Sequence, residues 1–288
     1  MKSLLSALLR MCPASVRNSV RGKLSWQPFF ERLHHLALVG MNYEEGFLIE
    51  ISGELDLLAR IHAAHTGGNP CVILDVGANV GHYTQAVLTT FGDRCYVHAF
   101  EPSARTAERF ASNIGPEHRV SLYPQALADT AGVAKLYTDS EASPVATLSP
   151  DALGGAFGHD QVFEEVRTET LDGFCCDHRI DRIHLLKMDA EGFEFRILKG
   201  ASGMLDAERI DGIQWEFAYN NVYSRVFFRD FYDLLSPRYN LFRLVKDGLY
   251  PLCSAYPYEV FRTINYYARL KRLPPLPVGP IRRLQSSN

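Results

Sequence analysis

The sequence has no excess of basic residues and no paired-cysteine motif. Its 288 residues contain 33 acids against 30 lysines and arginines, so the formal net charge is -3. A protein that binds nucleic acid through a broadly basic surface would carry the opposite sign. The six cysteines form no CxxC pair, which argues against a zinc or disulfide framework and fits a reducing compartment. We therefore expect a cytoplasmic protein without a nucleic-acid partner.

Long apolar runs are also lacking. The run Leu4–Leu9 is interrupted by Arg10 and is too short to cross a bilayer. Residues 1–30 contain five basic residues and no acid. We expect a basic surface helix here, with peripheral membrane contact through residues 1–30 as the alternative, because basic amphipathic helices bind anionic lipid.

The composition is that of a globular protein, with 47% apolar and 22% charged residues. From Cys71 onward, short apolar runs alternate with segments of helical periodicity, which predicts an α/β fold with a parallel sheet covered on both faces. The expected strands are residues 71–76, 96–100, 120–123, 184–188 and 210–217, and the expected helices are residues 83–91, 104–114, 194–205 and 228–235.

Two regions break this alternation. Extended pieces near residues 130–171 predict a β insertion between the third and fourth core strands. Near the C-terminus, Leu241–Val245 and Glu259–Ile264 are expected to form an antiparallel pair around the Asp247-Gly248 turn.

The strongest local motif follows the first expected strand. This strand ends at Asp75, and Gly77 and Gly81 precede a helix. Glycines permit a sharp turn and a close approach of a ligand to the backbone. The spacing is GxxxG after an acid and not the GxGxxG of dinucleotide folds. Because a pyrophosphate site keeps carboxylates away from the helix N-terminus, Asp75 favours a cationic or zwitterionic ligand.

A second acid, Glu101, ends the second expected strand. A carboxylate at this place can accept both hydroxyls of a ribose. Asp75 and Glu101 together predict a site for a nucleoside without phosphates, namely S-adenosylmethionine. Taken singly, Asp75 could be a helix N-cap and Glu101 a surface residue.

Several further segments occur in a fixed order. They are Asp-Val-Gly-Ala-Asn-Val-Gly (75–81), His-Ala-Phe-Glu-Pro (98–102), Gln-Ala-Leu-Ala-Asp (125–129), Thr-Leu-Asp (170–172), Leu-Leu-Lys-Met-Asp-Ala-Glu-Gly-Phe-Glu (185–194), Leu-Lys-Gly-Ala (198–201) and Ile-Gln-Trp-Glu-Phe (213–217). Over residues 40–265 the chain resembles the FkbM family of S-adenosylmethionine-dependent methyltransferases. The resemblance implies the class I methyltransferase fold, a Rossmann-like seven-strand sheet that is mostly parallel with a C-terminal antiparallel strand.

The resemblance also implies an organisation of the chain and a set of cofactor-binding residues. Residues 1–69 would form a basic helical segment and cofactor cover, 70–268 the methyltransferase domain, and 269–288 a Pro-rich tail. The cofactor-binding residues would be Asp75, Gly77, Ala78, Asn79 and Gly81 at the methionyl end, Glu101, Pro102 and Ser103 at the ribose, Gln125 and Ala126 at the adenine, and Asp189 beside the methyl donor.

Methyl transfer to a hydroxyl needs a general base within hydrogen-bond reach. The candidate catalytic acids are Asp189, Glu191 and Glu216, at or just after expected strand ends, where open α/β sheets bind ligands. Lys187 is expected to pair with a neighbouring acid. The three acids could instead hold Mg²⁺, but their spacing does not favour it and we assign no metal ligands.

Better-known FkbM members O-methylate hydroxyls of sugars and polyketides. The resemblance therefore implies a methyltransferase for a hydroxyl of a sugar, glycan or other small polyhydroxylated metabolite. Tyr219, Asn220 and Asn221 are candidates for contact with a sugar ring. The alternatives are a non-catalytic protein or an NAD(P)-binding Rossmann-like protein. The oligomeric state is not encoded in any motif.

Overall fold

The computed structural model describes residues 18–43, 49–138, 146–148, 162–256 and 258–277. The chain divides into two compact units, residues 1–41 and 42–288. In the first unit a short 3₁₀ helix η1 (Leu24–Trp26) leads into α3 (Gln27–Gly40). Pro28 stands in the first turn of α3, where its missing N–H costs no helical hydrogen bond. None of the helices within the described ranges has the length and apolar character needed to cross a bilayer.

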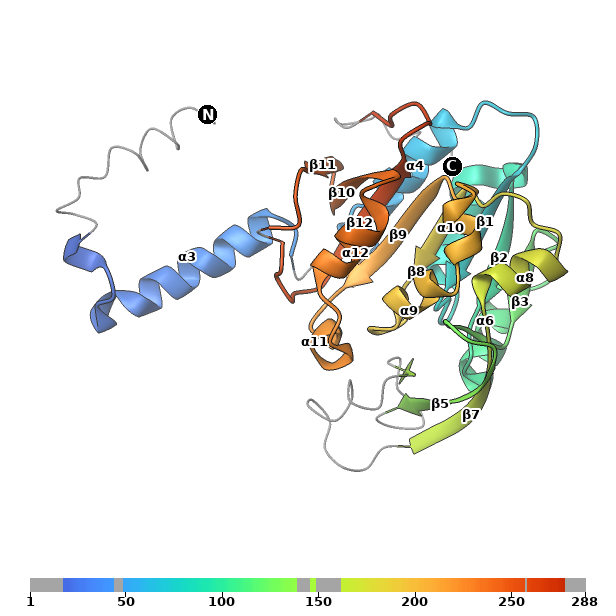
Figure 1. Cartoon of the computed structure of the whole chain (residues 1–288), viewed down its shortest axis with the longest axis horizontal. Coiled ribbons are helices and arrows are strands. Elements are labelled where there is room, and N and C mark those ends of the chain that lie inside the picture. Colours follow the sequence, from blue (N-terminus) through green and yellow to red (C-terminus); the bar gives the residue numbers. More distant parts are fainter. Residues whose placement is uncertain (1–17, 44–48, 139–145, 149–161, 257, 278–288) are drawn as a thin grey trace. The chain divides into compact units, whose positions relative to one another are not determined.

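The second unit is built on an eight-stranded sheet (Figure 1). Five strands are mutually parallel: β1 (Cys71–Val76), β2 (Cys95–Phe100), β3 (Val120–Tyr123), β8 (Leu185–Met188) and β9 (Gly212–Phe217). Three C-terminal strands complete it: β10 (Tyr239–Val245), β11 (Gly248–Leu252) and β12 (Ile264–Leu270). The strand order is β11-β10-β12-β9-β8-β1-β2-β3.

This order confirms the predicted fold class. The antiparallel strand β12 lies between β9 and β10, as the C-terminal strand of a class I methyltransferase sheet does, and β11 adds an edge strand. The predicted antiparallel turn after Leu241–Val245 is present, but Glu259–Ile264 is the wrong partner across it. A two-residue turn lets β10 pair with β11, and the last strand begins only at Ile264.

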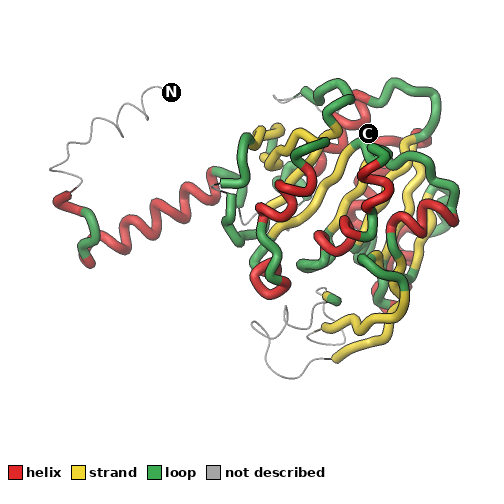
Figure 2. The backbone as a smooth tube through the Cα atoms, in the orientation of Figure 1, coloured by secondary structure: helices red, strands yellow, loops and turns green. Residues whose placement is uncertain are grey.

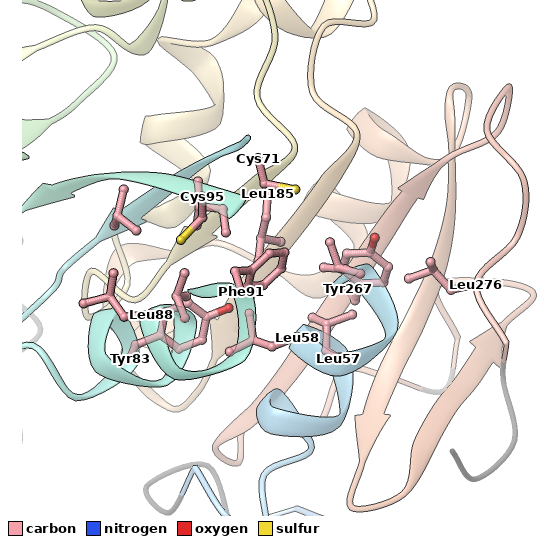
Figure 3. Close-up of a cluster of buried hydrophobic side chains, with 14 of the residues drawn as sticks. Leu57, Leu58, Cys71, Tyr83, Leu88, Phe91, Cys95, Leu185, Tyr267 and Leu276 are labelled. Carbon is pink, nitrogen blue, oxygen red and sulfur yellow. The ribbon is translucent and has the colours of Figure 1, made fainter. Parts of the chain in front are cut away.

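Helices cover both faces of the sheet. On one face, α4 (Glu54–Ala64) and α5 (His82–Phe91) contribute Leu57, Leu58 and Phe91 to a buried cluster with Cys71 and Tyr267 (Figure 3); α6 (Ala104–Ile114) follows β2. The remaining helices are α8 (Leu171–Asp177), α9 (Glu194–Lys199), α10 (Ser202–Asp206), α11 (Asn220–Ser224) and α12 (Phe228–Leu235). On the other face, Trp215 stacks on Phe231 of α12 with ring centroids 5.3 Å apart.

The region after β3 forms a second, four-stranded sheet with the order β4-β7-β5-β6. Its strands are β4 (Ala126–Leu127), β5 (Gly132–Thr138), β6 (Ala146–Thr147) and β7 (Val162–Glu169). β5 and β7 run antiparallel as a ribbon beside the main sheet (Figure 2). The sheet falls where the sequence predicts a β insertion, and it follows directly from the carboxyl end of β3.

Candidate active site

A cavity of about 420 Å³ lies at the carboxyl ends of the parallel strands. Ligands of open α/β sheets bind at this edge because the loops after successive strands meet there. The loops after β1, β2, β3 and β8 contribute Gly77, Asn79, Glu101, Pro102, Ser103, Gln125, Ala126, Asp189, Ala190 and Glu191 to its lining.

The loop after β1 passes very close to the loop after β8. Gly77 adopts a φ of +73°, which favours glycine. A Cβ added at Gly77 would lie 1.8 Å from the backbone oxygen of Asp189. The amides of Gly77 and Ala78 both donate to the Phe100 carbonyl at 3.0 Å. Gly77 is therefore required here by its backbone conformation and by the approach of the Asp189 backbone, whereas the predicted close approach of a ligand stays a prediction.

Glu101 lies in the cavity wall with 6% of its surface exposed. Its two carboxylate oxygens accept hydrogen bonds from the backbone amides of Asn79 and Ser103, each at 3.0 Å. Burial raises the pKa of Glu101 to about 7, against the lowering effect of these two amides. Each oxygen keeps a further lone pair, so Glu101 can accept two vicinal hydroxyls from the cavity side.

Asp75 lies behind the cavity wall and is fully buried. The Thr84 hydroxyl donates to its Oδ2 at 2.6 Å, and Lys187 Nζ lies 3.4 Å from its Oδ1. Asp75 therefore acts on the site through Lys187, which also lies close to Asp189. A direct contact of the cofactor with Asp75, Ala78 or Gly81, none of which is among the lining residues, stays a prediction.

Lys187 is buried between two acids, which confirms the expectation that it pairs with a neighbouring carboxylate. Its Nζ lies 3.6 Å from Asp189 Oδ2 and donates to the Gly77 carbonyl at 3.3 Å. Burial alone would lower the pKa of Lys187, but the charges of Asp75, Asp189 and Glu54 outweigh it and raise the pKa. Lys187 therefore holds a positive charge next to the carboxylate of Asp189.

Two of the three candidate catalytic acids, Asp189 and Glu191, line the cavity. Asp189 follows β8, and its side chain is 40% exposed. Glu191 lines the same cavity and accepts a hydrogen bond from the Asn220 side chain, while its backbone oxygen accepts one from the Thr147 hydroxyl at 2.9 Å. Glu216, on β9, does not line the cavity.

The pKa values of the two glutamates, Glu191 and Glu216, are raised. Burial, reinforced by the charge of Asp189, raises the pKa of Glu191 to about 8. Burial and the same charge raise the pKa of Glu216 well above its usual value near 4.5. Glu191 therefore holds a proton over much of the neutral range.

Several lining residues were not predicted from the sequence. They are Arg105, Thr106 and Arg109 of α6, and Leu136, Thr138, Phe163 and Glu164 of the insertion. The spacing of residues 105 and 109 by one helical turn after Glu101 could have indicated the first group. The insertion carries no comparable pattern.

Glu194 also has a role that the sequence did not reveal. It is fully buried at the start of α9, and its Oε1 accepts the amides of Ala190 and Gly192 at 2.7 and 3.2 Å. It thereby shapes the turn that carries Glu191, which has a positive φ of +52°. Of the candidates for sugar contact, Tyr219 is exposed, whereas Asn221 is buried and its Oδ1 accepts the Ala218 amide.

A metal centre was a less favoured interpretation of the acids. Within the described ranges, no three or more His, Cys, Asp or Glu side chains are grouped so that they could hold a metal ion.

The strand order and the cavity at the ends of β1, β2 and β8 define a protein of the class I methyltransferase fold. The family model for the methyltransferase FkbM domain matches residues 75–244, more than half of the chain. The chain therefore belongs to the FkbM methyltransferase family, as the sequence motifs predict.

The chain is also similar to individual proteins. It is 27% identical over 164 residues to the 2-O-methyltransferase NoeI of Sinorhizobium fredii (strain NBRC 101917 / NGR234); the match covers 53% of this chain and 65% of NoeI, less than two thirds of that relative. Among solved structures, the plantazolicin methyltransferase BpumL has a TM-score of 0.42 at 8% identity, covering 76% of this chain and 83% of BpumL. The 23S rRNA methyltransferase ErmE has a TM-score of 0.37 at 12% identity, covering 76% of this chain and 69% of ErmE.

The buried acids of the site predict a pH-dependent stability. Burial raises the pKa of Glu101 and Glu194 to about 7 and that of Glu191 to about 8. Between pH 6.5 and 8.5 the folded state holds protons that the unfolded chain has already released, so stability is lost as pH rises through this range. We expect the free energy of unfolding to fall by roughly 1 to 3 kcal/mol in urea denaturation.

The variant Glu191→Gln supplies the control, because it removes from this titration an acid whose pKa is raised to about 8. Its unfolding free energy should depend less on pH over the same range. A wild-type stability that increases from pH 6.5 to 8.5 would contradict the assignment of these protons.

Proposed function

We propose that this protein is an S-adenosylmethionine-dependent methyltransferase that methylates a hydroxyl of a sugar, a glycan or another small polyhydroxylated molecule. The observation that carries the proposal is the placement of Glu101, a strand-end carboxylate, inside a cavity that also contains Asp189. Membership of the FkbM family and the similarity to a protein named as a 2-O-methyltransferase support it.

The cavity residues fit the proposed cofactor. The carboxylate of Glu101 can accept the two ribose hydroxyls, and Gly77 and Asn79 line the cavity where the methionyl part would lie. Gln125 and Ala126 line the part of the cavity that follows β3, where the adenine would lie. When bound, S-adenosylmethionine supplies a methyl group on a positively charged sulfur, which is electrophilic without further activation.

Asp189 is the best general base among the candidate acids. Its side chain is 40% exposed and lines the cavity, so the carboxylate can reach an acceptor hydroxyl. Glu191 is held by Asn220 and keeps a proton near neutral pH, and Glu216 does not line the cavity. The Nζ atom of Lys187 lies 3.6 Å from Asp189 Oδ2, so its charge stabilises and orients the carboxylate. In this arrangement Asp189 would take the proton of the acceptor hydroxyl, and S-adenosylmethionine would supply the methyl group and leave as the neutral thioether, its sulfur keeping the electron pair of the broken C–S bond.

Glu191 has a different part in the proposal. Its carboxyl group is held by the Asn220 amide and retains a proton near neutral pH. A protonated carboxyl can donate a hydrogen bond to a second oxygen of the acceptor. A molecule with neighbouring hydroxyl groups would satisfy Asp189 and Glu191 together, which is why we propose a polyhydroxylated acceptor.

Calorimetric titration with S-adenosylmethionine and, separately, with NAD tests the cofactor. Binding of S-adenosylmethionine and no binding of NAD is the expected result, and the reverse would overturn the proposal. Transfer of a labelled methyl group is then measured with mono- and oligosaccharides, amines and RNA. Methylation of a sugar hydroxyl supports the proposed acceptor class, whereas methylation of RNA or of amines alone would contradict it.

Removing the ribose-binding carboxylate should weaken cofactor binding. For Glu101→Ala we expect a loss of about 1 to 3 kcal/mol in binding free energy, the range for a lost hydrogen bond to a charged group. The measurement is the dissociation constant of S-adenosylhomocysteine. Glu165→Ala is the matched control, because Glu165 is exposed on β7 and does not line the cavity. An unchanged dissociation constant for Glu101→Ala would contradict the assignment.

A further inference from the structure

The first compact unit carries an apolar surface that the proposed methyl transfer does not use. We define the α3 apolar face as the exposed side chains Trp26, Phe29, Phe30, Leu33 and Leu36. Their exposed fractions are 41%, 53%, 38%, 48% and 66%. Of the residues of α3, only Leu38 is buried. We propose that this face binds to the surface of an anionic membrane.

The apolar side chains share one side of the helix. Phe29, Leu33 and Leu36 follow the i, i+4, i+7 spacing, and Phe30 lies next to them around the helix. The rings of Trp26 and Phe30 lie 5.8 and 5.4 Å from that of Phe29. Clustered aromatic side chains that are exposed to water indicate an interaction surface, because their burial is favourable.

The charges around this face favour lipid head groups as the partner. Within residues 18–41 the basic residues are Arg21, Lys23 and Arg32, and the one acid is Glu31. By helical periodicity Arg32 borders the apolar face, whereas Glu31 lies on the opposite side. Long basic side chains at such a border can reach lipid phosphates while their stems stay among apolar groups. A second copy of this unit would instead bring like charges together.

The dimensions of α3 decide how the helix would bind. Its 14 residues span roughly 21 Å, less than the roughly 30 Å of a hydrocarbon core. The helix would therefore lie in the plane of the interface, with Trp26 and the phenylalanines inserted at the level of the head groups.

Vesicle binding of the full chain tests the proposal. The probes are vesicles of phosphatidylcholine alone and of phosphatidylcholine with phosphatidylglycerol. We expect cosedimentation with the second kind and a blue shift of tryptophan fluorescence. The shift reports on Trp26, because the chain has two tryptophans and Trp215 is already fully buried. No binding to the anionic vesicles would overturn the proposal.

Two variants separate the apolar and the charged contributions. We expect Phe29→Ser/Leu33→Ser and Lys23→Glu/Arg32→Glu each to lower partitioning by about tenfold or more. Tyr256→Ser is the control, because Tyr256 is 84% exposed outside this unit, and it should bind as the wild type does. Retained binding of S-adenosylhomocysteine shows that the second unit is still folded.

Two results would overturn the inference after a positive first test. One is wild-type vesicle binding by both variants. The other is a dimer, detected by light scattering, that Phe29→Ser/Leu33→Ser dissociates while vesicle binding is unchanged. Neither result bears on cofactor binding, so the membrane proposal and the proposed methyl transfer fail separately.

Discussion

Asp189→Asn should abolish most methyl transfer while leaving cofactor binding nearly intact. Loss of a general base lowers a rate by about 10²- to 10⁴-fold, and asparagine keeps the shape of the side chain without its basicity. Lys187 retains its second partner, Asp75, at 3.4 Å, so the buried charge stays compensated. We therefore expect the dissociation constant of S-adenosylhomocysteine to change by less than about threefold.

The experiment measures single-turnover methyl transfer with an acceptor that the wild type methylates. Asp206→Asn is the matched control, because Asp206 forms a surface ion pair with Arg238 and does not line the cavity. A variant that keeps more than a tenth of the wild-type rate would exclude Asp189 as the base. If Glu191→Gln alone removed the activity, the roles of the two acids would be exchanged.

The second large effect is expected for Gly77→Ala. A side chain at this position combines a left-handed backbone, with a φ of +73°, with a Cβ 1.8 Å from the Asp189 carbonyl oxygen. The backbone conformation costs about 1 to 2 kcal/mol, and forcing the two loops apart adds about 1 to 3 kcal/mol. We expect a total loss of stability of roughly 2 to 5 kcal/mol and no measurable cofactor binding.

Gly115→Ala is the control that separates the cost of the backbone conformation from the cost of the clash between a Cβ added at Gly77 and the Asp189 carbonyl oxygen. Gly115 has a φ of +69°, but no atom lies within 4 Å of its added Cβ. Its ψ of -166° lies in a region that glycine alone readily adopts, so this variant should lose only the conformational part, about 1 to 3 kcal/mol in chemical denaturation, and should bind cofactor normally. Equal destabilisation of the two variants would show that the approach of the loops has no energetic consequence.

The sequence predicts the parallel core well because its strands are continuous apolar runs. Residues 71–76 were expected as a strand and form β1 with these bounds. Glu101 was expected at a strand end and lies in the cavity. The antiparallel end of the sheet was less predictable. β12 contains Asn265 and Arg269 on either side of its aromatic pair, so its burial follows from tertiary contacts and not from a simple apolar pattern.

The finer geometry of the site depends on which strands become neighbours. β1 pairs with β8, and in this register Asp75 lies opposite Lys187. More than 100 residues separate them in the sequence, so no local pattern could show that Asp75 would be turned toward a lysine. Glu54 likewise has a partner that is distant in the sequence, because its carboxylate accepts a hydrogen bond from the side chain of Gln214 at 2.6 Å. Long-range pairing thus decides which of the predicted acids face the ligand.

The bond from Thr147 to Glu191 has a consequence for protein engineering. Thr147 is buried and ties the short strand β6 to the backbone of the turn that carries Glu191. A chimera that exchanged the β5–β7 segment for that of another family member, in order to change the acceptor, would cut this link. Unless the graft brings a hydroxyl to the same place, the altered enzyme would lose turnover as well as its old selectivity.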